Sequence, residues 1–121
     1  MSNNIIGFSK NWNNKLNNHA FTTIRLHNPK KYVLGNTYRI ELNKKPLGTA
    51  VLTCKRQLSI DQLNDFICYL DLGYSRLKAI ITLRRMYKDV NMETAVFDFC
   101  LLVYQAPSNQ ATKAVQTSLE L

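Results

Sequence analysis

A threonine and an arginine stand two residues apart in the segment 21–26, whose side chains are typical of a strand. Because side chains alternate along a strand, Thr23 and Arg25 project from the same face. A guanidinium on such a face can donate paired hydrogen bonds to a phosphate or to the edge of a base. We therefore expect Arg25 to contact a ligand, with an ion pair to an acid such as Asp71 as the alternative.

Two tyrosines, Tyr69 and Tyr74, flank Asp71 and can stack a base, while core packing with an exposed hydroxyl is the other interpretation of each. Arg84 falls inside the apolar arc of its expected helix when the segment is projected at the helical repeat. Its head group must then reach a cleft or solvent, unless the helix unwinds before it. Trp12 is expected to anchor a short helix by packing.

Basic side chains outnumber acidic ones by 16 to 8, and the formal net charge is +8. Such a charge favours polyanions such as nucleic acid, suits an acidic protein partner equally well, or serves solubility alone. Three basic pairs lie in or beside expected turns. If the turns share one end of the fold, the pairs form a patch that tracks phosphates; a solvated rim of loops is the simpler interpretation. The pairs are Lys30-Lys31, Lys44-Lys45 and Lys55-Arg56.

The strands that hold these groups follow from side-chain periodicity. The clearest lies at 37–42, where apolar residues alternate with Thr37, Arg39 and Glu41. The last one is apolar on both faces apart from Asp98, which is typical of a central strand. Strands are predicted at 5–8, 21–26, 37–42, 47–55 and 94–104.

Three helices are predicted between these strands. A short, Asn-rich one covers 10–18, and Ser59 begins a capping box at the start of a second one at 60–70. Gly73 ends the second helix, and Ser75 caps a third. Apolar residues recur at helical intervals in the second helix, and those of the third are expected to face the core: Ile60, Leu63, Phe66, Ile67 and Leu70, then Leu77, Ile80, Ile81 and Leu83.

The chain of 121 residues, 45% of them hydrophobic, suits one domain with one core. We expect this domain at 1–105, followed by a polar tail at 106–121 for which a short terminal helix is the alternative. The order of the elements predicts an α+β fold, in which a curled, largely antiparallel sheet is covered by helices at its edge.

The cysteines Cys54, Cys68 and Cys100 have no C-x-x-C spacing and lie among apolar residues, so all three are expected to be buried and reduced. With only His19 and His27 beside them, no zinc ligand set is apparent, and neither a metal nor a cofactor is expected. No run approaches the roughly 20 apolar residues of a membrane span, and the Asn-rich start does not resemble a secretory signal. We expect a cytoplasmic protein with no membrane partner.

An ordered series of short motifs resembles the ASCH domain of the PUA-like superfamily over residues 5–104. This resemblance implies a small β-barrel flanked by three short helices, with a cleft that holds RNA or a modified nucleoside. The motifs are Ile6-Gly7-Phe8-Ser9, then Trp12, Lys15 and Leu16, Phe21-Thr22-Thr23-Ile24-Arg25, Gly35-Asn36-Thr37-Tyr38, Pro46-Leu47-Gly48, Leu58-Ser59-Ile60-Asp61 and Phe97-Asp98-Phe99.

The small bacterial amidohydrolases that resemble this chain remove the acetyl group from acetylcytidine with a Lys, a Thr and a carboxylate. Their Lys and Thr stand in a Lys-x-x-Thr-x-Arg pattern. Thr23 and Arg25 match this pattern, but Ala20 occupies the Lys position, and the resemblance places the carboxylate at Asp71. A Thr hydroxyl without a neighbouring base is a weak nucleophile at neutral pH, so this departure favours binding over catalysis.

Two residues are candidates to replace the missing amine. His19 shares the face of Thr23 and Arg25 if the strand extends back that far, and Lys15 lies on the preceding helix.

The first hypothesis for the function is a non-catalytic domain that binds RNA or a nucleotide. The second is a small amidohydrolase acting on a modified nucleoside, and the third is an adaptor for an acidic protein. Predicted ligand-binding residues are Thr23, Arg25, Asp71, Tyr74, Arg84 and Lys15; Thr23, Asp71 and His19 are the catalytic ones if the chain is an enzyme.

Overall fold

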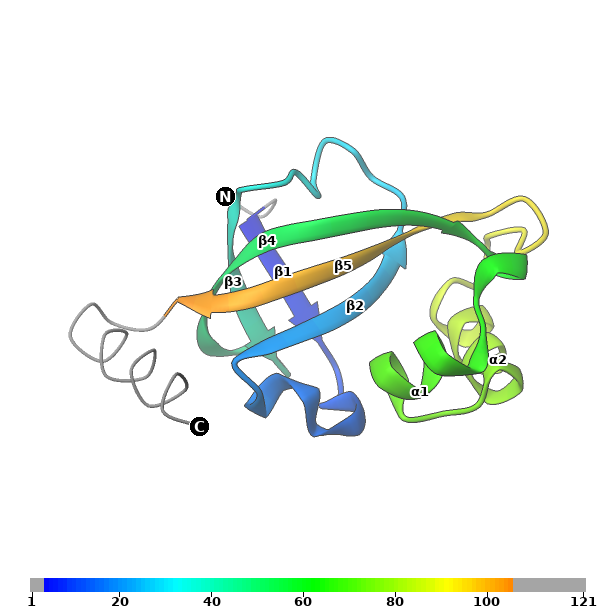
Figure 1. Cartoon of the computed structure of the whole chain (residues 1–121), viewed down its shortest axis with the longest axis horizontal. Helices are drawn as coiled ribbons and strands as arrows, with labels where there is room; N and C mark the ends of the chain where they lie inside the picture. Colours follow the sequence, from blue (N-terminus) through cyan, green and yellow to red (C-terminus); the bar gives the residue numbers. More distant parts are fainter. Residues whose placement is uncertain (1–3, 106–121) are drawn as a thin grey trace.

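The structure, a computed structural model, describes residues 4–105 as one curled sheet with helices gathered at one side (Figure 1). The α+β class is therefore confirmed for these residues, and the expected tail at 106–121 lies outside them. Every expected strand is present, β3 with the expected bounds and β4 longer than expected at both ends. The strands are β1 (Ile5–Phe8), β2 (Ala20–Leu26), β3 (Thr37–Leu42), β4 (Lys45–Ser59) and β5 (Val96–Gln105).

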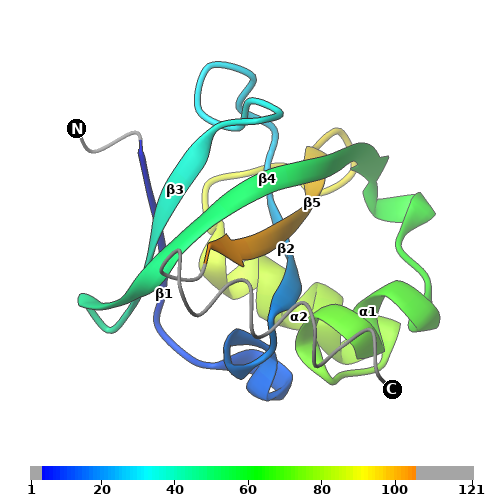
Figure 2. The ribbon, with the colours of Figure 1, turned by 60° about the vertical axis from the view of Figure 1, so that its left-hand side comes forward.

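Hydrogen bonds arrange the strands in the order β1-β3-β4-β5-β2, so β1 and β2 form the two edges. β1 runs parallel to β3, and the other pairings are antiparallel. The sheet curls into a half-barrel (Figure 2), and a side chain of β2 reaches the backbone of β1 across the opening. β5 lies inside the sheet between β4 and β2, as expected from its two apolar faces.

The Asn-rich segment folds as a 3₁₀-helix, η2 (Trp12–Asn17), and not as the expected α-helix. Asn13 and Asn14 have φ angles of 57° and 53°, in the left-handed region that asparagine tolerates better than most residues. The regular helical repeat is therefore lost, and the adjacent residues Lys15 and Leu16 are both buried.

The second expected helix divides into two pieces. The capping box at Ser59 forms, but it caps only one 3₁₀ turn, η3 (Ile60–Gln62). The α-helix α1 (Asp65–Leu72) starts after Asn64, whose side chain accepts a hydrogen bond from the backbone N–H of Ile67. As expected, Gly73 ends α1 in the left-handed conformation, and Ser75 caps α2 (Arg76–Met86).

Apolar side chains form two buried clusters, one inside the curl of the sheet and one between the sheet and the helices. The expected core face of α2 is partly wrong. Leu77 is 72% exposed and Ile81 45%, because the helix packs through Ala79 and Leu83, one turn apart. In α1, likewise, Phe66 and Leu70 are exposed, while the buried residues are Cys68, Asp71 and Leu72.

Two of the three cysteines are buried as expected, Cys68 and Cys100, but Cys54 is exposed. The reason is an irregularity in the pairing of β4 with β5 between Leu52 and Cys54, which shifts the alternation of side chains. Burial is the main cause that raises the pKa of Cys100 to about 12. Among residues 4–105, no helix has both the length and the apolar character needed to cross a membrane.

Candidate functional site

A cavity of about 130 Å³ opens where the end of β1, η2, β2 and the two α-helices meet. Four of the predicted site residues line this inner cavity, although they come from three separate segments of the chain: Lys15, Thr23, Arg25 and Asp71. Its apolar walls include Phe8, Trp12, Leu72, Leu83 and Tyr87.

Arg25 spans the opening between the two edge strands. Its Nε donates a hydrogen bond to Thr23 Oγ1 at 2.9 Å, and its Nη2 donates one to the carbonyl oxygen of Gly7 in β1 at 2.9 Å. The guanidinium also lies over the ring of Phe8, 4.6 Å from its centre. These contacts leave further N–H groups of the guanidinium for a ligand, and the structure places Thr23 and Arg25 at one cavity, as their spacing predicts.

A buried ion pair also lines the inner cavity. Lys15 Nζ donates to Asp71 Oδ1 at 3.0 Å, and the two residues are only 4% and 1% exposed. Thr22 Oγ1 donates to the same carboxylate oxygen at 2.8 Å. Asp71 is presented from α1 between Cys68 and Leu72, which are also buried. An acid within the apolar face of a helix is expensive to bury alone, so its partners hold it in place.

The inner cavity carries more positive than negative charge. Among the described residues Asp71 forms an ion pair with Lys15 and not with Arg25, so the alternative expected for Arg25 is wrong. Burial lowers the pKa of Lys15, Asp71 opposes this effect, and the charge of Arg25 adds to it. Burial and then Arg25 also lower the pKa of Lys31. An anion or a carbonyl oxygen is therefore the group most strongly attracted here.

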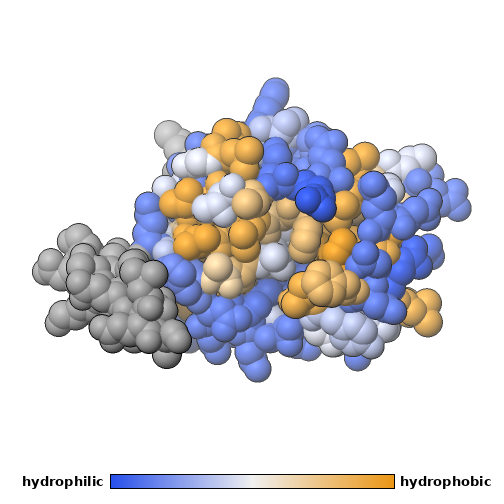
Figure 3. Space-filling model, viewed as in Figure 1, coloured by the Kyte–Doolittle hydropathy of each residue, from blue (hydrophilic) through white to orange (hydrophobic). Residues whose placement is uncertain are grey.

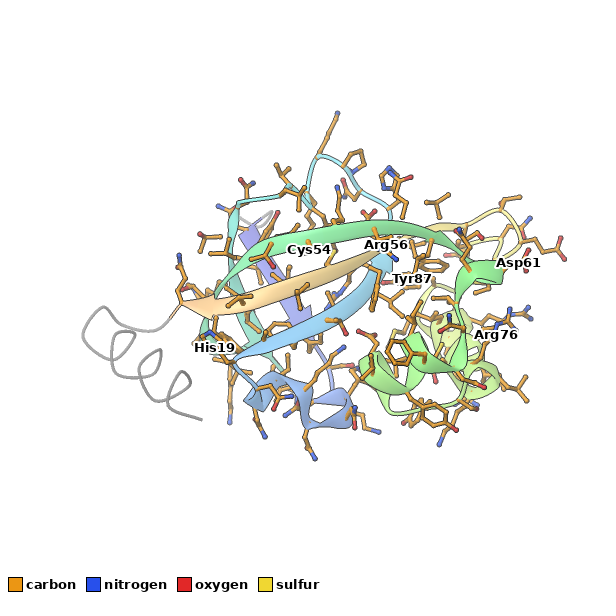
Figure 4. The ribbon with its side chains drawn as sticks, viewed as in Figure 1. His19, Cys54, Arg56, Asp61, Arg76 and Tyr87 are labelled. Carbon is orange, nitrogen blue, oxygen red and sulfur yellow. The ribbon has the colours of Figure 1, made fainter. Side chains whose placement is uncertain are left out.

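His19 is not brought to this cavity. It lines a separate open hollow of about 850 Å³ with Tyr104 and residues near the start of β4. Four residues of extended chain separate it from Thr23, which is about 13 Å of strand. Figure 4 accordingly shows His19 at one end of β2 and Tyr87, which lines the inner cavity, far from it. His19 is therefore too far from Thr23 to act as its base.

Tyr74 and Arg84 do not line the inner cavity. Tyr74 packs edge-on against Trp12 with ring centres 5.8 Å apart, and its hydroxyl accepts a hydrogen bond from Lys10 Nζ. Arg84 is exposed on α2, which stays helical past this residue, and it borders a different surface hollow. The expectation for Arg84 depended on a core face of α2 that the structure does not have.

The expected patch of three basic pairs is not formed. Lys45 begins β4, and Lys55 lies within the same strand, roughly 33 Å further along if the strand is straight. Lys55 Nζ donates to the carbonyl oxygen of Tyr32 at 2.7 Å, which ties it to the loop that carries Lys30 and Lys31. Two of the pairs are therefore neighbours, and Lys44-Lys45 is remote from them.

Two aromatic residues of the site were not predicted as ligand contacts. Trp12, expected only as a packing anchor, packs against both clusters and also lines the inner cavity. Tyr87 follows the end of α2, where helical periodicity gives no signal. Asp71, by contrast, could be recognised in the sequence, because an acidic residue three positions after Cys68 and one before Leu72 interrupts the apolar face of α1.

No group of three or more His, Cys, Asp or Glu side chains within residues 4–105 is arranged to hold a metal ion. Comparison of the chain with protein-family models, with curated proteins and with solved structures finds no match. Chemically, the inner cavity offers a fixed guanidinium, a hydroxyl and an amine with a lowered pKa, all at the edge of an apolar pocket. Such groups can orient and polarise a planar polar ligand.

Proposed function

We propose that this chain is an ASCH domain of the PUA-like type and that it binds RNA or a nucleotide through the inner cavity. The observation that carries the proposal is the convergence of Arg25, Thr23 and the Lys15–Asp71 pair on one pocket, from three separate segments. Buried polar groups are expensive to maintain, and a cluster of them with a perturbed lysine at a cavity favours a functional site over a purely structural one.

The size of the cavity indicates which part of a nucleotide enters it. Its volume is about 130 Å³, whereas a cavity of about 150 Å³ holds a benzene ring and sites for drug-sized ligands begin at about 300 Å³. The cavity is thus slightly smaller than one that encloses a six-membered ring, and because it opens to the surface we expect at most one pyrimidine ring to enter it, with its sugar and phosphate outside. A base can enter in this way only when it is turned out of the stack, which favours an unpaired base of single-stranded RNA over a base in a duplex.

Each polar group then has a role. Arg25 donates from its remaining N–H groups to a ring carbonyl or a phosphate oxygen. Thr23 accepts a hydrogen bond from Arg25, which leaves its own hydroxyl hydrogen for a ring acceptor. The rings of Trp12 and Tyr87 supply apolar walls for a flat ligand.

The test compares two arginine variants that remove the same charge. Arg25→Met removes the guanidinium of the cavity, and Arg39→Met removes an exposed one on β3. We expect Arg25→Met to weaken binding of a short single-stranded oligoribonucleotide at low salt by about tenfold or more, the equivalent of about 1.4 kcal/mol, and Arg39→Met to weaken it only slightly. Equal losses in both variants, or no binding by the wild type, would contradict the proposal.

A second candidate, amide hydrolysis on a modified nucleoside, is favoured by one observation. Lys15 lines the same cavity as Thr23, and burial lowers its pKa, which is the condition for a lysine to act as a base. In this mechanism, neutral Lys15 takes the proton of the Thr23 hydroxyl as the oxygen attacks the amide carbon, and Arg25 stabilises the oxyanion. The C–N bond then breaks as protonated Lys15 returns the proton to the leaving nitrogen of the nucleoside, and water hydrolyses the resulting acetyl ester on Thr23 to release acetate.

Acetylcytidine distinguishes the two candidates. The purified chain is incubated with it, and release of acetate is followed for the wild type, Thr23→Val and the double variant Lys15→Met/Asp71→Leu, which leaves no buried charge unpaired. The binding proposal predicts no turnover. Turnover that disappears in both variants would establish the amidohydrolase instead, and turnover that persists in both would indicate a contaminating enzyme.

A further inference from the structure

A further hollow of about 510 Å³, the outer hollow, lies on the outer face of the sheet. Its floor is formed by β2, β5 and β4, and its side wall by the start of α1. In the space-filling view, apolar side chains gather over β4 and β5 on this face (Figure 3), and Figure 4, drawn from the same side, places Cys54 and Arg56 there.

The strand register explains which side chains form the floor. Thr22 pairs with Leu101, and Leu101 with Cys54, so these three share a face. One step along, Arg56 pairs with Phe99 on the same face. The floor is therefore apolar, and it carries a guanidinium at its rim.

Phe66 stands beside this floor in the first turn of α1 and is 74% exposed. Arg56 is exposed as well, and within residues 4–105 the three ion pairs include neither Arg56 nor the adjacent Lys55. An exposed aromatic ring and an arginine that line one apolar hollow provide a stacking surface and a phosphate contact.

We propose that the outer hollow is a second subsite for single-stranded RNA, in which a base stacks on Phe66 and a phosphate contacts Arg56. The hollow has room for a whole nucleotide, whereas the inner cavity admits only a ring. An acidic peptide would be attracted to Arg56 but would leave the ring of Phe66 unused, so a nucleotide fits both features better. The choice of RNA as ligand class rests on the proposed function, but the geometry of this subsite is independent of the inner cavity.

One contact links the two regions through β2. Thr22 lines the outer hollow, and its hydroxyl donates to Asp71, which lines the inner cavity. The two subsites are therefore separated only by the edge strand β2.

Cys54 provides a direct test, because it lines the outer hollow and is exposed, whereas Cys68 and Cys100 are buried. The rate at which a maleimide labels Cys54 is measured with and without a short single-stranded oligoribonucleotide at low salt. We expect the RNA to slow labelling about tenfold. Phe66→Ala and Arg56→Met should remove this protection, while Leu77→Ala, an equally exposed apolar side chain on α2, should retain it. Protection that persists in Phe66→Ala, or that polyglutamate provides equally well, would overturn the subsite.

The fluorescence of Trp12, the only tryptophan of the chain, reports on the inner cavity in the same samples. We expect Arg25→Met to abolish the fluorescence response to RNA and to leave the protection of Cys54. A Trp12 response without protection of Cys54 would overturn the outer subsite and leave the proposed function standing. Protection of Cys54 in the wild type without a Trp12 response would overturn binding at the inner cavity and leave the outer subsite standing. RNA that changes neither signal would overturn both proposals.

Discussion

The inner cavity and the outer hollow are built in opposite ways on the two sides of β2. The inner cavity is lined by charged groups that already have fixed partners, with the buried Lys15 bonded to Asp71 and the half-buried Arg25 bonded to Thr23. The outer hollow presents exposed side chains, Phe66 and Arg56, above an apolar floor. The difference indicates that the inner groups contribute both to stability and to recognition, whereas the outer groups are available for binding alone.

The largest effect is expected when the buried ion pair is broken. Asp71→Asn leaves Lys15 buried without its counter-charge, which destabilises proteins by about 3–5 kcal/mol. Urea denaturation measures the loss. The double variant Lys15→Met/Asp71→Leu replaces both charges with apolar side chains and should recover most of the stability. A loss below about 1 kcal/mol in Asp71→Asn would show that the pair is not buried as described.

The stability of Asp71→Asn should depend on pH, and the lowered pKa of Lys15 gives the sign of this dependence. Burial lowers the pKa of Lys15 and Asp71 opposes this, so removing the carboxylate lowers the pKa further. The folded chain then releases the lysine proton at a lower pH than the unfolded chain, whose value is near 10.5. Between these two values the unfolded state binds more protons, and the stability of Asp71→Asn should rise with pH relative to the double variant.

Cys100 in β5 and Cys54 in β4 extend the comparison of buried with exposed groups, with a smaller expected effect on stability. The raised pKa of Cys100 stabilises the folded chain below pH 9.0, and the contribution is lost as pH rises toward 12. Between about pH 9 and 10.5, the wild type should lose about 2 kcal/mol that Cys100→Ala does not lose. Cys54→Ala keeps the buried Cys100 thiol and should therefore lose this contribution as the wild type does. Identical slopes for all three proteins would contradict the burial of Cys100.

A third effect concerns the opening between the edge strands. Arg25→Met removes hydrogen bonds to Thr23 and to Gly7, each worth about 0.5–1.5 kcal/mol. We expect a loss of about 1 to 2 kcal/mol in urea denaturation, whereas Arg39→Met, on the surface of β3, should stay within about 0.5 kcal/mol of the wild type. If both variants behave alike, Arg25 does not tie β2 to β1.

The smallest effect is expected in the outer hollow. Phe66→Ala should change stability by no more than about 0.5 kcal/mol, because the ring is 74% exposed and little apolar area is lost from the core. Thermal and urea denaturation check this. A loss above about 2 kcal/mol, typical of a buried phenylalanine, would assign the ring to packing and remove the main argument for the outer subsite.

Much of the sheet and one half of the inner cavity could be predicted from the sequence. Alternation located β3, and a spacing of two residues placed Thr23 and Arg25 on one face, because strand geometry is local. The other half depends on η2, where two left-handed asparagines end the regular repeat. Periodicity cannot follow such a segment, so the burial of Lys15 beside Asp71 could not be derived.

The exposed side of the helices shows a second limit of sequence patterns. Leu77 and Ile81 suit a core as well as Ala79 and Leu83 do, and only the packing of α2 decides between them. The exposure of Cys54 has a similar origin, since an irregularity in strand pairing changes the face without a sequence signal. Tertiary packing, and not local sequence preference, determines which of these side chains are buried and which are exposed.

A crystal structure of the protein grown with saturating cytidine 5′-monophosphate tests the central claim most directly. We predict that the pyrimidine ring occupies the inner cavity, with a guanidinium nitrogen of Arg25 and the hydroxyl of Thr23 within about 3.2 Å of its polar atoms. A ring bound elsewhere, with the inner cavity closed by its own side chains, would contradict the claim.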